Sequence, residues 1–166
     1  MNRLDPSAID VLAPNFKKRL SGVTATVVRL VPLQARDIAI AAVAPALPDH
    51  VPQIGLRDLV SMSRDGPSGA RVWHARRNSE MLAGIVLKRV LGKRLRLLFT
   101  SASQRRHTRY SKWLIGQMDA VISTSQKTAG YLDRPSSVIL HGIDVQAFSP
   151  PDDRAAIKRR LGLPPG

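Results

Sequence analysis

The residues of this sequence that could do chemistry lie in four short segments, each of which follows a predicted strand: residues 14–22, residues 74–80, residues 100–107, and residues 124–126 together with 141–144. Cationic side chains there suit the phosphate groups of a ligand, and hydroxyl, amide and imidazole groups suit sugar hydroxyls. No residue is assigned a catalytic role. The candidate substrate-binding residues are Asn15, Lys17, Lys18, Arg19, Ser21, Gly22, His74, Arg76, Arg77, Asn78, Glu80, Thr100, Ser101, Gln104, Arg105, Arg106, His107, Ser125 and His141.

The first of these segments has two interpretations. Ser21 and Gly22 precede a predicted helix, so free backbone N–H groups and the positive end of the helix dipole can receive an anion. Lys17, Lys18 and Arg19 strengthen the positive field at that point. A tight turn beside a solvated basic loop explains the same residues equally well, because the lone glycine is not a dinucleotide-binding fingerprint.

The second and third segments also have structural alternatives. Strand-end histidine and arginine side chains that lead into a helix suit sugar hydroxyls and phosphates, yet Glu80 can simply pair with Arg76 or Arg77 while Asn78 caps the helix. Hydroxyl side chains followed by two arginines predict a polar pocket wall or a phosphate clamp in the third segment. For His107 taken alone, a surface position in the next helix is favoured.

Several other chemistries find no support in the sequence. The chain has no cysteine, which excludes disulfides and cysteine metal sites. Its four histidines lack the spacing of metal ligands. No phosphate-binding P-loop and no nucleophile elbow around a serine is present. We therefore expect neither a metal nor a cofactor.

The chain is strongly basic, with 26 lysine and arginine residues against 12 acidic ones and a net charge of +14. Such a field favours nucleic acid, an anionic membrane surface or a phosphorylated substrate, and a merely solvated basic surface accounts for it equally well. Few aromatic residues lie near the basic clusters, which argues against nucleic acid. Because no signal peptide or membrane-spanning run is apparent, a cytoplasmic location is expected.

Aliphatic runs alternate with helical spacing along the chain, which predicts a doubly wound α/β domain with a mostly parallel, Rossmann-like sheet. Asn78 is the predicted N-cap of the third helix, and Pro32 is expected to kink or end the first. The predicted strands cover residues 9–13, 38–43, 71–75, 95–100, 120–124 and 138–140. The predicted helices cover residues 23–34, 56–63, 79–91, 108–117, 125–132 and 152–161.

Taken in order, four motifs resemble the acceptor-side half of family 4 glycosyltransferases, which have the GT-B architecture. They are the Ser-Gly-Val-Thr loop at 21–24, Trp73-His74 at the position of the family's V-x-H-x-H motif, residues 120–125, which resemble D-x-V-I-x-x-S, and residues 141–150, which resemble N-G-V-D-x-x-x-F-x-P. More narrowly, residues 73–84 and 99–108 are similar to lipopolysaccharide core mannosyltransferases.

This resemblance implies a reaction and its partners. It implies retaining transfer of mannose from GDP-mannose, or of a hexose from another nucleotide sugar, to a lipid-linked anionic oligosaccharide of the lipopolysaccharide core. It also implies peripheral contact with the inner face of the inner membrane. Two residues depart from the family pattern: Arg76 replaces a second histidine, and Thr100 stands where many relatives carry a histidine that contacts the donor sugar.

The resemblance also predicts how the chain is divided. Residues 1–150 are expected to form the acceptor-side domain, and residues 151–166 a linker and helix that lead toward a donor domain absent from this sequence. Because most of the donor's charge stabilisation belongs to that domain, we expect the chain alone to bind acceptor and to be inactive. The alternative is a non-catalytic basic module that binds RNA or an anionic membrane.

Overall fold

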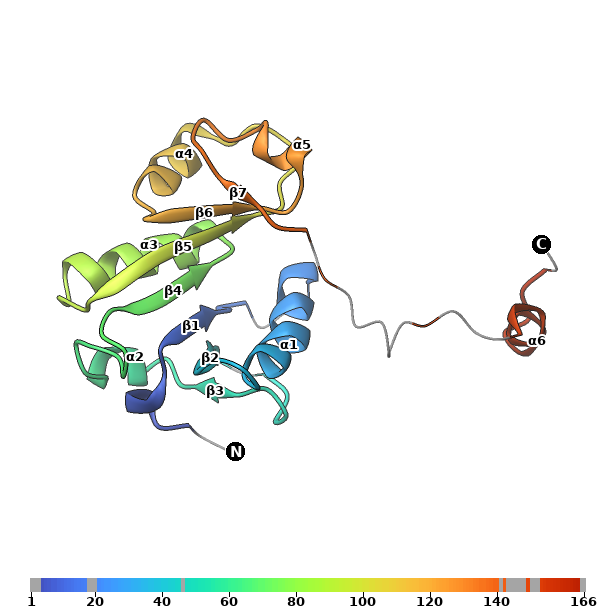
Figure 1. Ribbon diagram of the computed structural model, residues 1–166, viewed down its shortest axis with the longest axis horizontal. Helices are drawn as coiled ribbons and strands as arrows, with labels where there is room; N and C mark the ends of the chain where they lie inside the picture. Colours follow the sequence, from blue (N-terminus) through green and yellow to red (C-terminus); the bar gives the residue numbers. More distant parts are fainter. Residues whose placement is uncertain are drawn as a thin grey trace.

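A seven-stranded sheet organises the chain, and every neighbouring pair of strands in it is parallel. The computed structural model describes residues 4–17, 21–45, 47–140, 142, 149 and 153–164. In Figure 1 the strands follow one another from β7 at the top to β3 at the bottom, in the order β3-β2-β1-β4-β5-β6-β7. They are β1 (Val11–Pro14), β2 (Ile40–Val43), β3 (Gln53–Ile54), β4 (Arg71–Ala75), β5 (Leu95–Ser101), β6 (Ala120–Ser123) and β7 (Ser137–Val138).

Helices connect most of the strands, and several begin at a side-chain cap. Ser21 Oγ accepts a hydrogen bond from Thr24 N at 3.3 Å, and Thr108 Oγ1 accepts one from Ser111 N at 3.2 Å. Such caps satisfy backbone donors that have no partner within the first helical turn. The helical elements are η1 (Pro6–Ala8), α1 (Gly22–Gln34), α2 (Asp58–Ser61), α3 (Asn78–Arg89), α4 (Arg109–Gly116), α5 (Gln126–Ala129) and α6 (Arg154–Arg160).

The strand order reverses direction between β1 and β4, so right-handed crossovers place α1 on one face of the sheet and α3 on the other. The buried core divides accordingly. Val27 and Val31 of α1 pack with Ile40 and Ala42 of β2, whereas residues such as Trp73 belong to a second, larger cluster. The predicted doubly wound, Rossmann-like fold is thereby confirmed.

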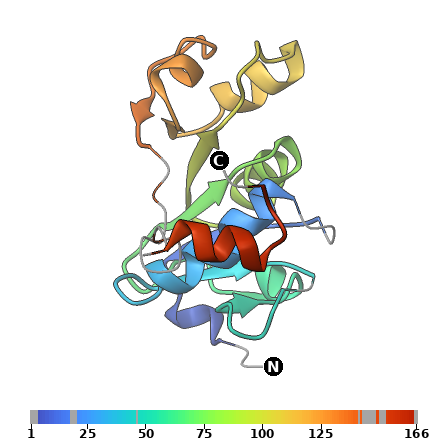
Figure 2. The same cartoon turned by 90° about the vertical axis from the view of Figure 1, so that its right-hand side faces the viewer.

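The second cluster is closed by α3 and α4, which lie side by side (Figures 1 and 2). Trp73 is fully buried beneath α3, and its Nε1 donates to the Glu80 carbonyl oxygen at 2.8 Å. A Cβ atom on Gly84 would lie 2.4 Å from Trp73 Cδ1, so only glycine allows α3 to approach the sheet this closely.

Three local predictions differ from the structure. Strand β3 was not predicted, because it has only two residues and follows a proline-rich stretch. Asn78 is not the N-cap of α3: Arg77 has the extended cap conformation, while Asn78 Nδ2 donates to Ser111 Oγ at 2.8 Å. Helix α5 is also shorter than predicted. The prediction for Pro32 agrees with the structure, since α1 ends two residues after it at Gln34.

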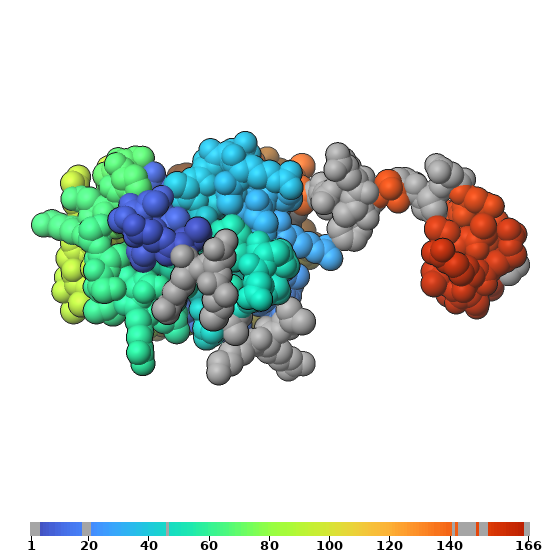
Figure 3. Space-filling model, turned by 90° about the horizontal axis from the view of Figure 1, so that it is seen from below, coloured from blue at the N-terminus to red at the C-terminus, as the bar shows by residue number. Residues whose placement is uncertain are grey.

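Helix α6 stands apart from the sheet in Figures 1 and 3. Its first turn is capped by Asp153, whose carboxylate accepts a hydrogen bond from Ala156 N at 2.8 Å. Across the described ranges, no helix has the length and apolar character needed to cross a bilayer.

Candidate functional site

The carboxyl ends of β1 and β4 meet at the point where the strand order reverses, which is where doubly wound sheets bind ligands. The loop after β1, the start of α1 and the start of α3 converge there. The structure separates the candidate residues at this edge into an internal polar network and the lining of a groove.

Arg77 is the centre of the internal network. Its Nη1 donates to Asn15 Oδ1 at 2.8 Å and to Glu80 Oε1 at 3.0 Å, and its Nη2 donates to Ser21 Oγ at 2.7 Å. Glu80 Oε2 accepts from the backbone N–H groups of Arg76 and Arg77 at 2.8 and 3.1 Å. Asn15 and Glu80 are fully buried. Of the two structural alternatives, Glu80 therefore pairs with Arg77, and the network joins the β1 loop to α1 and α3.

Burial and charge oppose each other at Glu80. Removal from water raises the pKa of this carboxyl, while hydrogen bonds from the Arg76 backbone and the nearby Arg77 guanidinium act to lower it. Because the buried Glu80 carboxylate is already bonded to the Arg77 guanidinium and to two backbone N–H groups, its role is to hold the local structure together and not to bind a ligand. Neither Arg77 nor Glu80 lines the groove.

The groove has a volume of about 530 Å³ and runs between α1 and the open face of β4, β5 and β6. The lining residues Gly22, Thr26, Leu30 and Gln34 follow one another at four-residue spacing, so one face of α1 forms a wall of the groove along the whole helix. The groove combines polar groups with aliphatic walls, a composition typical of small-molecule sites. Helix α1 contributes Gly22, Val23, Thr26, Leu30 and Gln34, and the other lining residues are His74, Arg76, Thr100, Ala102, Ile122, Thr124, Ile139, Leu140 and Gly142.

His74 and Thr100 form a hydrogen-bonded pair on the sheet side of the groove, with 2.7 Å between Nε2 and Oγ1. Burial lowers the pKa of His74 to about 3, and the adjacent Arg76 charge acts in the same direction. The imidazole is therefore neutral at physiological pH, and it can donate from one ring nitrogen and accept at the other.

Arg76 supplies the positive charge of the groove. Among the described residues, its only side-chain hydrogen bond runs from Nη1 to the His74 carbonyl oxygen at 3.3 Å. Burial lowers the pKa of this guanidinium, which nevertheless stays charged, because an arginine pKa starts above 12. A largely buried cation without a carboxylate in hydrogen-bond contact is suited to an anionic ligand.

The third candidate segment reaches this region only in part. Ser101 is buried, and its Oγ lies 3.4 Å from His107 Nε2. Burial lowers the pKa of His107. The side chains of Gln104, Arg105 and Arg106 are exposed on the following loop and do not line the groove.

The remaining candidates lie outside the groove or outside the described residues. Lys17 is exposed, and Asn78 bonds to Ser111. Ser125 caps α5 by accepting a hydrogen bond from Thr128 N at 3.1 Å. The structure does not describe Lys18, Arg19 and His141.

Sequence reasoning brought Gly22, His74, Arg76 and Thr100 to the groove but missed the rest of the wall that α1 contributes. The four-residue spacing of Gly22, Thr26, Leu30 and Gln34 was the available signal, since it defines one face of a helix. No group of three or more histidine or acidic side chains suited to a metal ion occurs in the described part of the chain.

Two curated proteins match the chain over most of its length. Over 165 residues, or 98% of this chain and 47% of the other, it is 54% identical to the lipopolysaccharide core biosynthesis mannosyltransferase LpsB of Rhizobium meliloti (strain 1021). Over 158 residues, or 94% of this chain and 45% of the other, it is 49% identical to the lipopolysaccharide core biosynthesis mannosyltransferase LpcC of Rhizobium leguminosarum bv. viciae. Nearly the whole chain is therefore similar to about half of each of these two mannosyltransferases.

These two similarities agree with the resemblance found in the motifs. The chain spans about half the length of the curated relatives it matches. No protein-family model matches it, and no solved structure does.

Proposed function

We propose that this chain supplies the acceptor-binding half of a mannosyltransferase of lipopolysaccharide core biosynthesis. The donor is GDP-mannose or another nucleotide sugar, transfer retains the anomeric configuration without a metal or cofactor, and the enzyme works at the inner face of the inner membrane. The names of its two relatives support the sugar and the acceptor class. The groove beside α1 is the proposed acceptor site.

The observation that carries this proposal is the charge of Arg76 within a partly apolar groove. The acceptor expected from the relatives' names is an anionic oligosaccharide, and the Arg76 guanidinium has donors to spare for a phosphate or carboxylate. His74, Thr100 and Thr124 add donors and acceptors for sugar hydroxyls on the same side. The aliphatic wall from Val23 and Leu30 suits the apolar face of a sugar ring.

Calorimetric titration of the chain with delipidated core oligosaccharide tests this assignment. Arg76→Met should weaken binding at least about tenfold, because the buried charge and its hydrogen bonds to the anion are lost. Arg57→Met removes an exposed arginine at the start of α2 and serves as the charge-matched control. Equal affinities for Arg76→Met and the control would contradict the proposal.

In the proposed mechanism, the acceptor-binding half cannot catalyse transfer without a donor-binding domain. A donor diphosphate develops charge as its bond to the sugar breaks, and cationic groups must stabilise that charge. We propose that a second, donor-binding domain supplies them, so the chain alone should bind GDP-mannose weakly and transfer no mannose. Mannose transfer by purified residues 1–166, followed with radiolabelled GDP-mannose, would refute this part of the proposal.

A further inference from the structure

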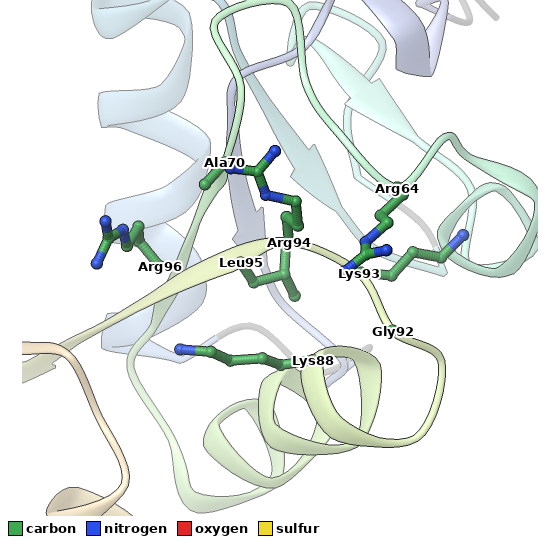
Figure 4. Close-up of a pocket in the computed structure, with 8 residues that line it drawn as sticks. All are labelled: Arg64, Ala70, Lys88, Gly92, Lys93, Arg94, Leu95 and Arg96. Carbon is green, nitrogen blue, oxygen red and sulfur yellow. The ribbon is translucent and has the colours of Figure 1, made fainter.

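A second pocket, of about 340 Å³, lies at the amino end of β5, where α3 turns into that strand (Figure 4). Five cationic residues line it together with Ala70, Gly92 and Leu95, and none of them was a candidate in the sequence. They are Arg64, Lys88, Lys93, Arg94 and Arg96. Together these five side chains form the cationic pocket.

Contacts within the protein account for only part of this charge. Lys88 Nζ pairs with Asp119 at 2.8 Å, Arg94 Nη1 pairs with Asp65 at 3.1 Å, and Lys93 Nζ donates to two backbone carbonyl groups. Arg64 and Arg96 make no side-chain hydrogen bond or ion pair with any described residue. Five cations thus face two carboxylates, and the pocket keeps an excess of positive charge.

The negative end of the α3 dipole does not explain the two remaining arginines. Lys88 lies in the last helical turn, where a cation is favourable. Arg64 instead belongs to the loop before β4, and Arg96 belongs to β5. In Figure 4 their side chains extend from different segments on either side of the pocket. Two small residues, Ala70 and Gly92, also line the pocket, and the φ of +63° at Gly92 favours glycine.

An exposed aliphatic strip leads to this pocket along α3. Leu82, Val86 and Val90 follow one another at four-residue spacing and are 39%, 42% and 73% exposed, and Leu91 is 44% exposed. Val90 and Leu91 immediately precede Gly92 of the pocket. A soluble phosphate would contact the cationic side chains alone. An anionic lipid would contact these cations through its headgroup and Val90 and Leu91 through its apolar part.

We propose that the cationic pocket binds the phosphate headgroup of an anionic lipid while Val90 and Leu91 enter the bilayer interface beside it. Cations near an anionic surface and partly inserted aliphatic side chains are the two contributions that hold peripheral proteins on membranes. This site rests on the membrane contact of the proposed function and deepens it by naming a surface for that contact, at the opposite end of the strands from the groove.

Sedimentation with vesicles tests the proposal. The chain should bind vesicles of phosphatidylcholine and phosphatidylglycerol, and bind those of phosphatidylcholine alone far less. Arg64→Ala/Arg96→Ala should weaken binding at least about tenfold, because each cation near an anionic surface contributes substantially to attraction. Val90→Ser/Leu91→Ser should weaken it about fivefold through lost apolar insertion. All four side chains are exposed, so circular dichroism should confirm folded variants.

The control is Arg36→Ala/Lys127→Ala, which removes the same charge from exposed positions outside the pocket. If this control loses as much binding as Arg64→Ala/Arg96→Ala, a diffuse basic surface explains the attraction and the pocket is overturned. If glycerol phosphate competes fully and Val90→Ser/Leu91→Ser binds vesicles like wild type, the site takes a soluble phosphate and the lipid is overturned. Neither assay contains donor or acceptor sugar, so failure here is distinguishable from failure of the proposed function.

Discussion

The two faces of β4 and β5 have different surroundings. On one face Trp73, Ala75, Leu97 and Phe99 are buried beneath α3. On the other face His74 and Thr100 border a groove that α1 closes only along one side. Since successive residues of a strand point to opposite faces, the same two strands supply both stability and a polar site. Adjacent residues should therefore differ sharply in what their substitution costs.

The largest effect is expected from Trp73 and its neighbour in sequence. Trp73→Ala removes a fully buried indole and its hydrogen bond to Glu80, which should lower the free energy of unfolding by about 4 kcal/mol. His74→Ala, on the open face, should cost less than about 2 kcal/mol. Urea unfolding measures both. Similar losses of unfolding free energy in Trp73→Ala and His74→Ala would show that the two faces are equally buried. If Trp73→Ala does not fold, Trp73→Phe is the milder variant to measure.

A smaller effect is expected at Arg77, which joins the two faces at the carboxyl edge. Arg77→Met leaves the buried Glu80 without its guanidinium, which should cost about 3 kcal/mol of unfolding free energy. Arg77→Met/Glu80→Gln removes the stranded charge as well and should recover part of that loss. Arg109→Met, an exposed arginine on α4, is the control and should change little. A double variant less stable than Arg77→Met would contradict the role given to this pair.

The next effect is a pH dependence that belongs to the open face. His74 has a folded-state pKa of about 3, against about 6.5 when unfolded, so between these values only the unfolded chain binds the proton. Its contribution to stability is complete above pH 6.5 and is lost as the pH falls toward 3. Between pH 7 and pH 5 the loss should be about 2 kcal/mol.

Urea unfolding at several pH values measures this dependence. His74→Gln should reduce the fall in stability between pH 7 and pH 5, whereas the exposed His50→Gln should keep it. An unchanged pH profile in His74→Gln would mean that the imidazole is hydrated, and that the groove is more open than the geometry indicates.

The sequence predicted the fold well because continuous aliphatic strands and amphipathic helices are local patterns. It also placed His74, Arg76 and Thr100 at one edge, since parallel strands end together there. It did not predict the bond between Arg77 and Asn15, whose partners are 62 residues apart in the chain. Local reasoning left two pairings open for Glu80, because only packing selects Arg77 over Arg76. The cationic pocket escaped prediction for the same reason, as its arginines come from separate segments.

The central claim is that the groove beside α1 receives the acceptor, and filling the groove tests it most directly. Thr26 lines the groove, while its exposed neighbour Ala25 does not, so Thr26→Trp and Ala25→Trp add the same bulk to the same helix. Affinity for delipidated core oligosaccharide should be measured by calorimetry for both folded variants. The account predicts that Thr26→Trp binds at least about tenfold more weakly than wild type while Ala25→Trp is unchanged. Wild-type affinity in Thr26→Trp would contradict it.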